Sequence, residues 1–127
     1  MANLELRMDD DLNKLLYLSC KLVVLQNLKA CYDYELSTDF PQETRNFRSS
    51  CILDQIKLIL DNLVDHVEWI GNVALGNLPC PEGQEEGINR IVADLDGLYT
   101  FTLEEAAKKE ARLKLMELER SMFKDEA

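Results

Sequence analysis

Apolar residues recur every three or four positions between residues 52 and 74, and this spacing constrains the fold more than any other feature of the chain. The recurring residues are Ile52, Ile56, Ile59, Leu60, Leu63, Val67, Ile70 and Ala74. At about 100° per residue they cover roughly half the circumference of one α-helix, and such a face must pack against other elements. We therefore predict a long helix from about residue 42 to 75, after the turn that ends at Pro41 and before Gly76 and Pro79.

Another long helix is expected from about residue 10 to 36. Its start is marked by Asp9, Asp10 and Asp11, whose carboxylates can accept hydrogen bonds from the unpaired N–H groups of a first helical turn. Its apolar side chains cover most of the helix circumference instead of one side. A helix of this kind must be surrounded, so we expect it either at the centre of a bundle or in the interface of a homo-oligomer.

Two shorter helices are expected in the remainder of the chain. Apolar residues at helical spacing predict a helix over about 84–97, which Gly97 is expected to end. Thr102 and Glu105 match a capping box, in which each side chain accepts a hydrogen bond from the other residue's backbone N–H. A further helix is therefore predicted over about 103–123.

The apolar residues of this last helix fall into two weak stripes. One stripe consists of Ala111, Leu115, Leu118 and Met122, and the other of Leu113, Met116 and Phe123. Two stripes are typical of a helix that contacts two neighbours, or that docks one stripe on its own domain and offers the other to a partner. Both interpretations stay open at this point.

The expected fold is all-α, a compact four-helix bundle-like domain with two long and two shorter helices. No stretch alternates apolar and polar residues over the length of a strand. A chain of 127 residues is near the usual size of one domain, and its 46% hydrophobic and 30% charged residues suit a folded protein. We therefore expect residues 1–127 to form a single helical domain.

The charge balance limits the kinds of partner. Lys and Arg total 14 against 24 Asp and Glu, a formal net charge of −10. Such a surface repels a phosphate backbone, so no direct binding of nucleic acid is expected. It attracts basic protein surfaces, and it can imitate the charge of a nucleic acid toward a protein that binds one. The alternative is that the acidity only keeps a small protein soluble.

The cysteines and the most apolar segment indicate a soluble, intracellular protein. The four cysteines are Cys20, Cys31, Cys51 and Cys80, without a Cys-x-x-Cys pair. No secretory signal precedes them, so we expect reduced thiols and a cytoplasmic location, with the first three in the core. The apolar segment 15–28 contains Lys21 and is shorter than a membrane span, so it is expected to be a buried helix.

The sequence carries no pattern typical of an enzyme, a metal site or a cofactor site. His66 is the single histidine, which is too few for the paired Glu-x-x-His motifs of a metal-binding bundle. We expect His66 to be a structural residue. The segment from Asp94 to Gly97 lacks the first and last ligands of a calcium loop, and the glycines form no nucleotide-binding motif. No catalytic residue, metal or cofactor is therefore predicted.

The candidate partner-binding residues lie on the predicted helix 42–75. They are the acidic Asp54, Asp61, Asp65 and Glu68, together with Leu58 and Trp69. On a continuous helix the four carboxylates project within roughly 60° of one another, opposite the apolar face. Tryptophan is enriched at binding hot spots, but Trp69 also suits helix packing, and the stripe also suits an ordinary solvated face.

These features favour a non-enzymatic interaction protein: an adaptor, assembly factor or inhibitor that docks acidic helices on a basic protein surface. The alternative is a structural protomer, whose all-round apolar first helix and two-striped last helix complete their burial in a homo-oligomer. An enzyme or ligand carrier with a carboxylate site inside the bundle is the third interpretation, with the least support in the spacing of residues.

Overall fold

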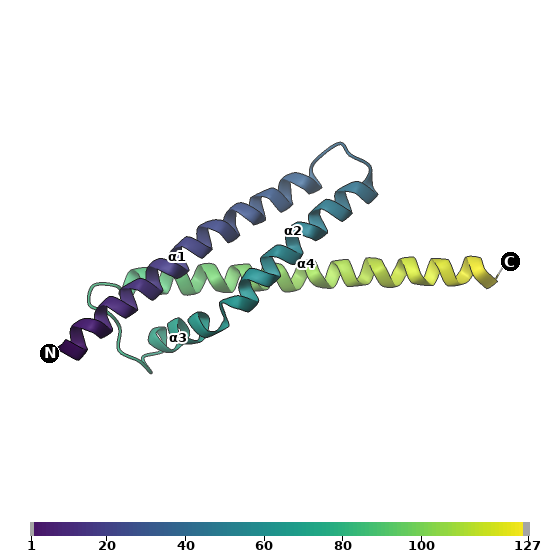
Figure 1. The fold of residues 1–127 in the computed structure, drawn as a ribbon. Helices are drawn as coiled ribbons and strands as arrows, with labels where there is room; N and C mark the ends of the chain where they lie inside the picture. The colour runs from purple at the N-terminus through teal and green to yellow at the C-terminus, as the bar shows by residue number, and fades with distance from the viewer. Residues whose placement is uncertain (1, 126–127) are drawn as a thin grey trace.

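The computed structural model describes residues 2–125, with side chains from Asp10 to Phe123. Over this range the chain forms four helices and no strand, as Figure 1 shows. The helices are α1 (Ala2–Leu36), α2 (Gln42–Asn62), α3 (Val64–Ala74) and α4 (Glu85–Asp125). The prediction of an all-α fold with two long and two shorter helices is confirmed.

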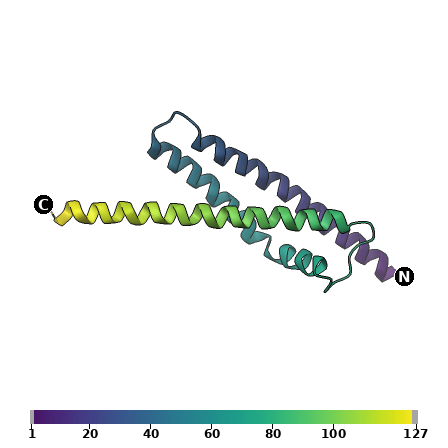
Figure 2. The same ribbon diagram turned by 180° about the vertical axis from the view of Figure 1, so that it is seen from behind.

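The four helices pack around one core. Helices α1 and α2 form an antiparallel hairpin, and the first half of α4 lies against this hairpin and against α3. The second half of α4 extends past the other helices, as both ribbon views show (Figures 1 and 2). The buried core residues are Leu15, Leu18, Leu22, Leu25, Ile56, Leu60, Leu63, Ile70, Val73, Ile88, Ile91, Leu95 and Leu98.

The turn between α1 and α2 is held by the polar residues that predicted it. Ser37 and Thr38 donate their hydroxyls to the carbonyl oxygens of Tyr34 and Glu35, at 2.8 and 2.9 Å. Nη2 of Arg48 donates to Oε1 of Glu35 at 2.9 Å, which joins the end of α1 to the first turns of α2. The last carbonyl groups of α1 are therefore capped by side chains as the chain leaves the helix.

Helix α1 begins earlier than predicted, so the expected start at residues 9–11 is wrong. The helix begins at Ala2 and runs through the aspartates. Nζ of Lys14 lies 3.3 Å from a carboxylate oxygen of Asp10 and 3.8 Å from one of Asp11, at helical spacings of four and three residues. A pair at this spacing favours the helix, so the aspartates are compatible with a helix interior as well as with a cap.

The predicted helix 42–75 is in fact two helices. Leu63, at φ −98° and ψ 2°, donates its N–H to the carbonyl of Leu60, three residues back, and the regular hydrogen-bond ladder stops there. Leu63 is buried, and the Tyr99 hydroxyl of α4 donates to the same Leu60 carbonyl at 3.3 Å. The break is stabilised from outside the segment, which explains why no glycine or proline marks it.

The two predicted helices 84–97 and 103–123 are one continuous helix, α4. The expected stop at Gly97 is wrong, because Gly97 has no positive φ and lies between the buried Leu95 and Leu98. The expected capping box is also wrong: the buried Thr102 donates its hydroxyl to the carbonyl of Leu98 at 2.7 Å, inside the helix. The burial of Leu95 and Leu98 on either side of Gly97 outweighs the low helix propensity of glycine, which costs about 1 kcal/mol.

The predicted stop at Gly76 is confirmed. Helix α3 ends at Ala74, and Gly76 adopts φ +83°, a conformation that L side chains rarely adopt. The N–H groups of Gly76 and Asn77 donate to the carbonyls of Val73 and Asn72, at 3.1 and 2.9 Å. This pattern is a Schellman motif, in which glycine provides the left-handed residue after the helix.

Candidate interaction surfaces

The six candidate partner-binding residues come from two helices. Asp54, Leu58 and Asp61 lie on α2, whereas Asp65, Glu68 and Trp69 lie on α3. Apart from Trp69 they are exposed, and Leu58 exposes 62% of its surface. The expected single stripe is therefore divided by the bend at Leu63, but its four carboxylates all reach solvent. We call Asp54, Leu58, Asp61, Asp65 and Glu68 the acidic face.

One of these four carboxylates is paired with a cation. Nζ of Lys109 on α4 lies 3.3 Å from a carboxylate oxygen of Asp54. Burial raises the pKa of the Tyr99 hydroxyl, and the nearby charge of Asp61 raises it further. Among the side chains that the structure describes, no cation pairs with Asp61, Asp65 or Glu68. Their negative charge therefore remains available to a partner, in the manner that favours association with a basic surface.

Trp69 lies partly buried at the side of α3 that faces α1. Its ring packs against the core, and Nζ of Lys14 lies 5.1 Å from the ring centroid. The indole is thus enclosed more than the neighbouring acidic side chains, and it anchors α3 to α1 through packing and a cation–π contact. The structure places Trp69 at the edge of the acidic face, and its role in binding a partner stays a prediction.

His66 lies beside Trp69 on the same side of α3. Its ring packs on Tyr17 of α1, with 4.7 Å between ring centroids and 34° between ring planes. Its Nδ1 atom is buried without a hydrogen-bond partner among the described residues. Nowhere among the residues that the structure describes are three or more His, Cys, Asp or Glu side chains placed to hold a metal ion. The histidine therefore takes part in packing between α1 and α3.

The outer face of α1 is exposed and carries no charge between residues 12 and 31. Its exposed residues are Leu12, Asn13, Leu16, Tyr17, Ser19, Cys20, Val23, Val24, Gln26, Asn27, Ala30 and Cys31. The three lysines of this stretch are partly buried and lie on aromatic rings: Lys14 on Trp69, Lys21 on Tyr17, which itself belongs to the exposed set, and Lys29 on Phe101, with Nζ 5.0 to 5.5 Å from the centroids. We call this the uncharged face of α1.

The exposure of residues on α1 and α2 contradicts two expectations from the sequence. The other described helices do not surround α1, although its apolar residues cover most of its circumference. The expected burial of Cys20, Cys31 and Cys51 is also wrong, because all three are exposed. Hydrophobicity predicted burial correctly for one side of α1 only, since the chain supplies too few helices to cover the other side.

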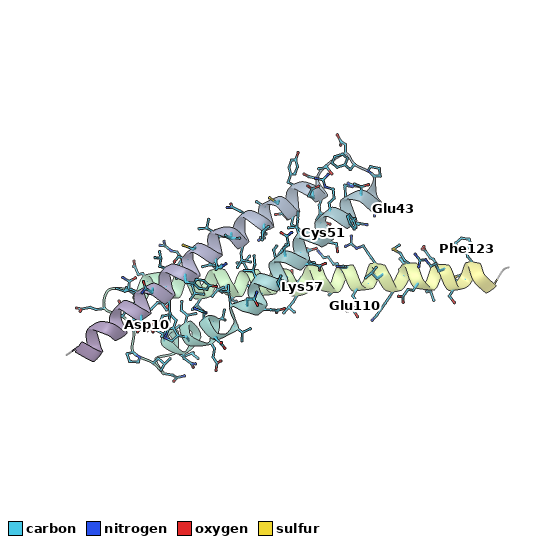
Figure 3. All side chains as sticks on the ribbon, viewed as in Figure 1. Asp10, Glu43, Cys51, Lys57, Glu110 and Phe123 are labelled. Carbon is cyan, nitrogen blue, oxygen red and sulfur yellow. The ribbon has the colours of Figure 1, made fainter. Side chains whose placement is uncertain are left out.

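The projecting end of α4 is a third exposed surface. Arg112 donates from Nη1 to Oδ1 of Asn46 at 2.6 Å, and it is the last described side chain of α4 with a hydrogen bond to another helix. Figure 3 shows Glu110 near the last contacts of α4 with α2 and, further along, Phe123 on the part of α4 that has left the other helices. Its apolar residues are all at least half exposed: Leu113, Leu115, Met116, Leu118, Met122 and Phe123.

Two hollows on the described surface can be compared with the surfaces above. One, of about 170 Å³, lies between α3 and α4 and is lined by Val67, Ile70, Gly71, Val92, Leu95, Asp96 and Tyr99. Its volume is below the range of about 300–1,000 Å³ in which small-molecule sites usually fall. The other, of about 410 Å³, is open and formed by Tyr34, Asp39 and Phe40 at the turn after α1. Each hollow is lined by one aspartate and one tyrosine and by no histidine, lysine or cysteine, so the surfaces described above are the stronger candidates for function.

Comparison with known protein families, with curated proteins and with solved structures finds no match to this chain. Between residues 2 and 125 no helix combines the length and the hydrophobicity required to cross a membrane. The candidate sites therefore rest on the geometry of the chain itself.

Proposed function

We propose that this chain is a non-enzymatic interaction protein of the cytoplasm, an adaptor, assembly factor or inhibitor, that docks its acidic face on a basic protein surface. Trp69 stands at the edge of this face as a candidate contact. The partner is a protein that presents lysine and arginine side chains, and a protein that normally binds nucleic acid offers such a surface.

The observation that carries this proposal is that the carboxylates of the acidic face are exposed and that most of them are paired with no cation that the structure describes. Asp61, Asp65 and Glu68 are exposed without a cation among the described side chains, and the exposed Leu58 lies on the same side of α2 as Asp54 and Asp61. Like charges at helical spacing weaken a helix slightly, so the neighbouring Asp61, Asp65 and Glu68 do not serve stability. An exposed leucine among carboxylates combines apolar contact with charge complementarity, as in protein interfaces.

The proposal is tested by affinity purification from the native host with two matched variants. The first reverses the face by Asp61→Lys, Asp65→Lys and Glu68→Lys. The second makes the same change of net charge elsewhere, by Glu82→Lys, Glu86→Lys and Glu104→Lys, all exposed in the structure.

We expect the wild type and the second variant to bind the same partner. The first variant is expected to lose this partner, and added salt is expected to release it from the wild type. Equal loss of the partner in both variants would show that bulk charge, and not the face, is responsible, and would contradict the proposal.

A second candidate function is that of a structural protomer in a homo-oligomer. The uncharged face of α1 supports it, because interface cores are depleted of charged residues and this face runs about 30 Å without one. Leu16→Glu with Val23→Glu is expected to dissociate such an oligomer in sedimentation equilibrium. A wild-type protein that is monomeric at ~100 μM would remove this candidate.

A further inference from the structure

The projecting end of α4 has the residue pattern of a coiled coil. Its stripe of Ala111, Leu115, Leu118 and Met122 has successive spacings of four, three and four residues, the period of an apolar coiled-coil seam. Of the 18 residues from 103 to 120, 17 are Ala, Glu, Lys, Leu or Arg, a composition typical of coiled coils. The stripe is exposed along its whole length.

The side of α4 that bonds to the rest of the molecule does not include this stripe. Glu105, Lys109 and Arg112 bond to α1 and α2, and they lie about 120° around the helix from the stripe. The other apolar stripe, with Leu113 and Met116, continues the side that faces α1 and α2. A second helix can therefore pack along the Ala111–Met122 stripe without displacing any of the described contacts of α4.

The charges of this segment suit a second copy of the chain. From 104 to 123 the acidic residues are Glu104, Glu105, Glu110, Glu117 and Glu119, and the basic residues are Lys108, Lys109, Arg112, Lys114 and Arg120. The five acidic and five basic residues cancel, whereas the whole chain carries a net charge of −10. Two copies that approach through this segment meet without net repulsion, and their acidic parts remain apart.

We propose that α4 pairs with α4 of a second copy in an antiparallel coiled coil, with the Ala111, Leu115, Leu118 and Met122 stripes in contact. In this arrangement Leu115 faces Leu118 of the second copy, and the small Ala111 faces the long Met122. Arg112 keeps its bond from Nη1 to Asn46 and turns its other guanidinium N–H groups toward Glu119 of the second copy, and two-fold symmetry repeats the pair. The acidic helix hairpins then lie at opposite ends of the dimer.

A parallel pair is less favourable on the same observations. It would set Ala111 against Ala111 and Met122 against Met122, which packs layers of unequal size. It would also bring two hairpins of net negative charge to the same end. In that arrangement Lys114, and not Arg112, would lie beside Glu119 of the second copy. The two orientations therefore differ in the partner of Glu119.

The first experiment measures the mass of the full chain by sedimentation equilibrium up to ~100 μM. We expect a monomer–dimer equilibrium that Leu115→Glu with Leu118→Glu weakens at least ~10-fold. Leu113→Glu places the same change on the other side of the same helix and is expected to leave the dimer unchanged. A monomeric wild type, or a dimer that survives the double variant, would overturn the proposal.

The same measurement separates this dimer from one formed by the uncharged face of α1. Dissociation by Leu16→Glu with Val23→Glu, and not by the α4 variant, would overturn the coiled coil and support the α1 interface. Neither result depends on the acidic face, so binding to a basic partner is tested independently.

The second experiment establishes the orientation by charge reversal and rescue. Glu119→Arg is expected to weaken the dimer about tenfold, because each of the two symmetry-related pairs becomes repulsive. Adding Arg112→Glu restores affinity in the antiparallel pair, since it re-forms opposite charges. Rescue by Lys114→Glu instead, with no rescue by Arg112→Glu, would overturn the antiparallel arrangement.

Discussion

The hydroxyl of Tyr32 on α1 donates to Oε2 of Glu105 on α4 at 2.8 Å. Tyr32 is buried, and its ring meets Phe101 edge to face with 5.3 Å between the centroids. Nζ of Lys108 bonds the other carboxylate oxygen of Glu105 at 3.1 Å. This group of side chains holds α4 to α1 near the point where α4 leaves the core, so it also supports the base of the projecting segment.

Tyr32→Phe is expected to lower the free energy of unfolding by about 1.5–3 kcal/mol, because it removes a hydrogen bond to a largely buried carboxylate. Urea denaturation followed by circular dichroism measures the change. Tyr34→Phe, two residues away on the same helix and exposed, is the matched control and is expected to change stability by less than about 0.5 kcal/mol. Equal effects would contradict the contribution of the Tyr32–Glu105 bond.

Stability is expected to fall at alkaline pH. Burial raises the pKa of the Tyr32 hydroxyl far above its ordinary value of 10.0, and the bond to Glu105 raises it further. The folded-state pKa of Tyr32 exceeds the unfolded one. The stabilisation that the protonated hydroxyl contributes is therefore complete below pH 10 and is lost as the pH rises from there toward the folded-state pKa. Melting temperatures at pH 8 to 11 should therefore decline less in Tyr32→Phe than in the wild type.

Acidic pH is expected to weaken the contact between Tyr32 and Glu105, because it protonates Glu105. Burial alone would raise the pKa of Glu105, but the hydrogen bonds from Tyr32 and Lys108 outweigh it and the pKa is lowered. Its contribution is therefore present above the unfolded value of about 4.3 and is lost as the pH falls through the folded-state pKa. Glu105→Gln should reduce the difference in unfolding free energy between pH 7 and pH 3.

Two glycines are expected to respond to alanine in opposite directions. Gly76→Ala places a side chain at φ +83° and is expected to destabilise the protein by about 1 kcal/mol or more. Gly97→Ala lies inside α4, where an added Cβ meets nothing within 4 Å, and is expected to stabilise by about 0.5–1 kcal/mol. Thermal unfolding measures both. Destabilisation by Gly97→Ala would contradict the continuous course of α4.

Two leucines of α1 test which side of that helix faces the core. Leu18 is fully buried, so Leu18→Ala is expected to cost about 2–5 kcal/mol of unfolding free energy. Leu16, two residues away, is 64% exposed, and Leu16→Ala is expected to cost less than about 0.5 kcal/mol in the monomer. Denaturant unfolding at a concentration where the protein is monomeric distinguishes them. A large cost at Leu16 under that condition would contradict the described packing of α1.

Local pattern was sufficient for the helical content and for several helix ends. The three- and four-residue spacing from Ile52 to Ile70 predicted apolar faces that do enter the core, whereas Ala74, predicted to share them, is exposed, and Gly76 ends α3 as predicted. Both features follow from helix geometry and from the freedom of glycine at positive φ, which act within a few residues along the chain. The exposure of the four carboxylates of the acidic face could be predicted for the same reason, since charged side chains opposite an apolar stripe face water.

Helix breaks and covered faces depended on contacts between distant residues. Leu63 ends α2 without a glycine or proline, and the Leu60 carbonyl is bonded by Tyr99, 39 residues further along the chain. Gly97 and Thr102 had the residue types of a stop and a cap, yet packing on either side keeps both inside α4. The partial burial of the lysines of α1 also depended on packing, because two of them, Lys14 and Lys29, lie on aromatic rings of other helices. Helix-forming tendency is a property of neighbouring residues, whereas which side of a helix is buried depends on where the other helices lie, and the free energy of burial outweighs local preference.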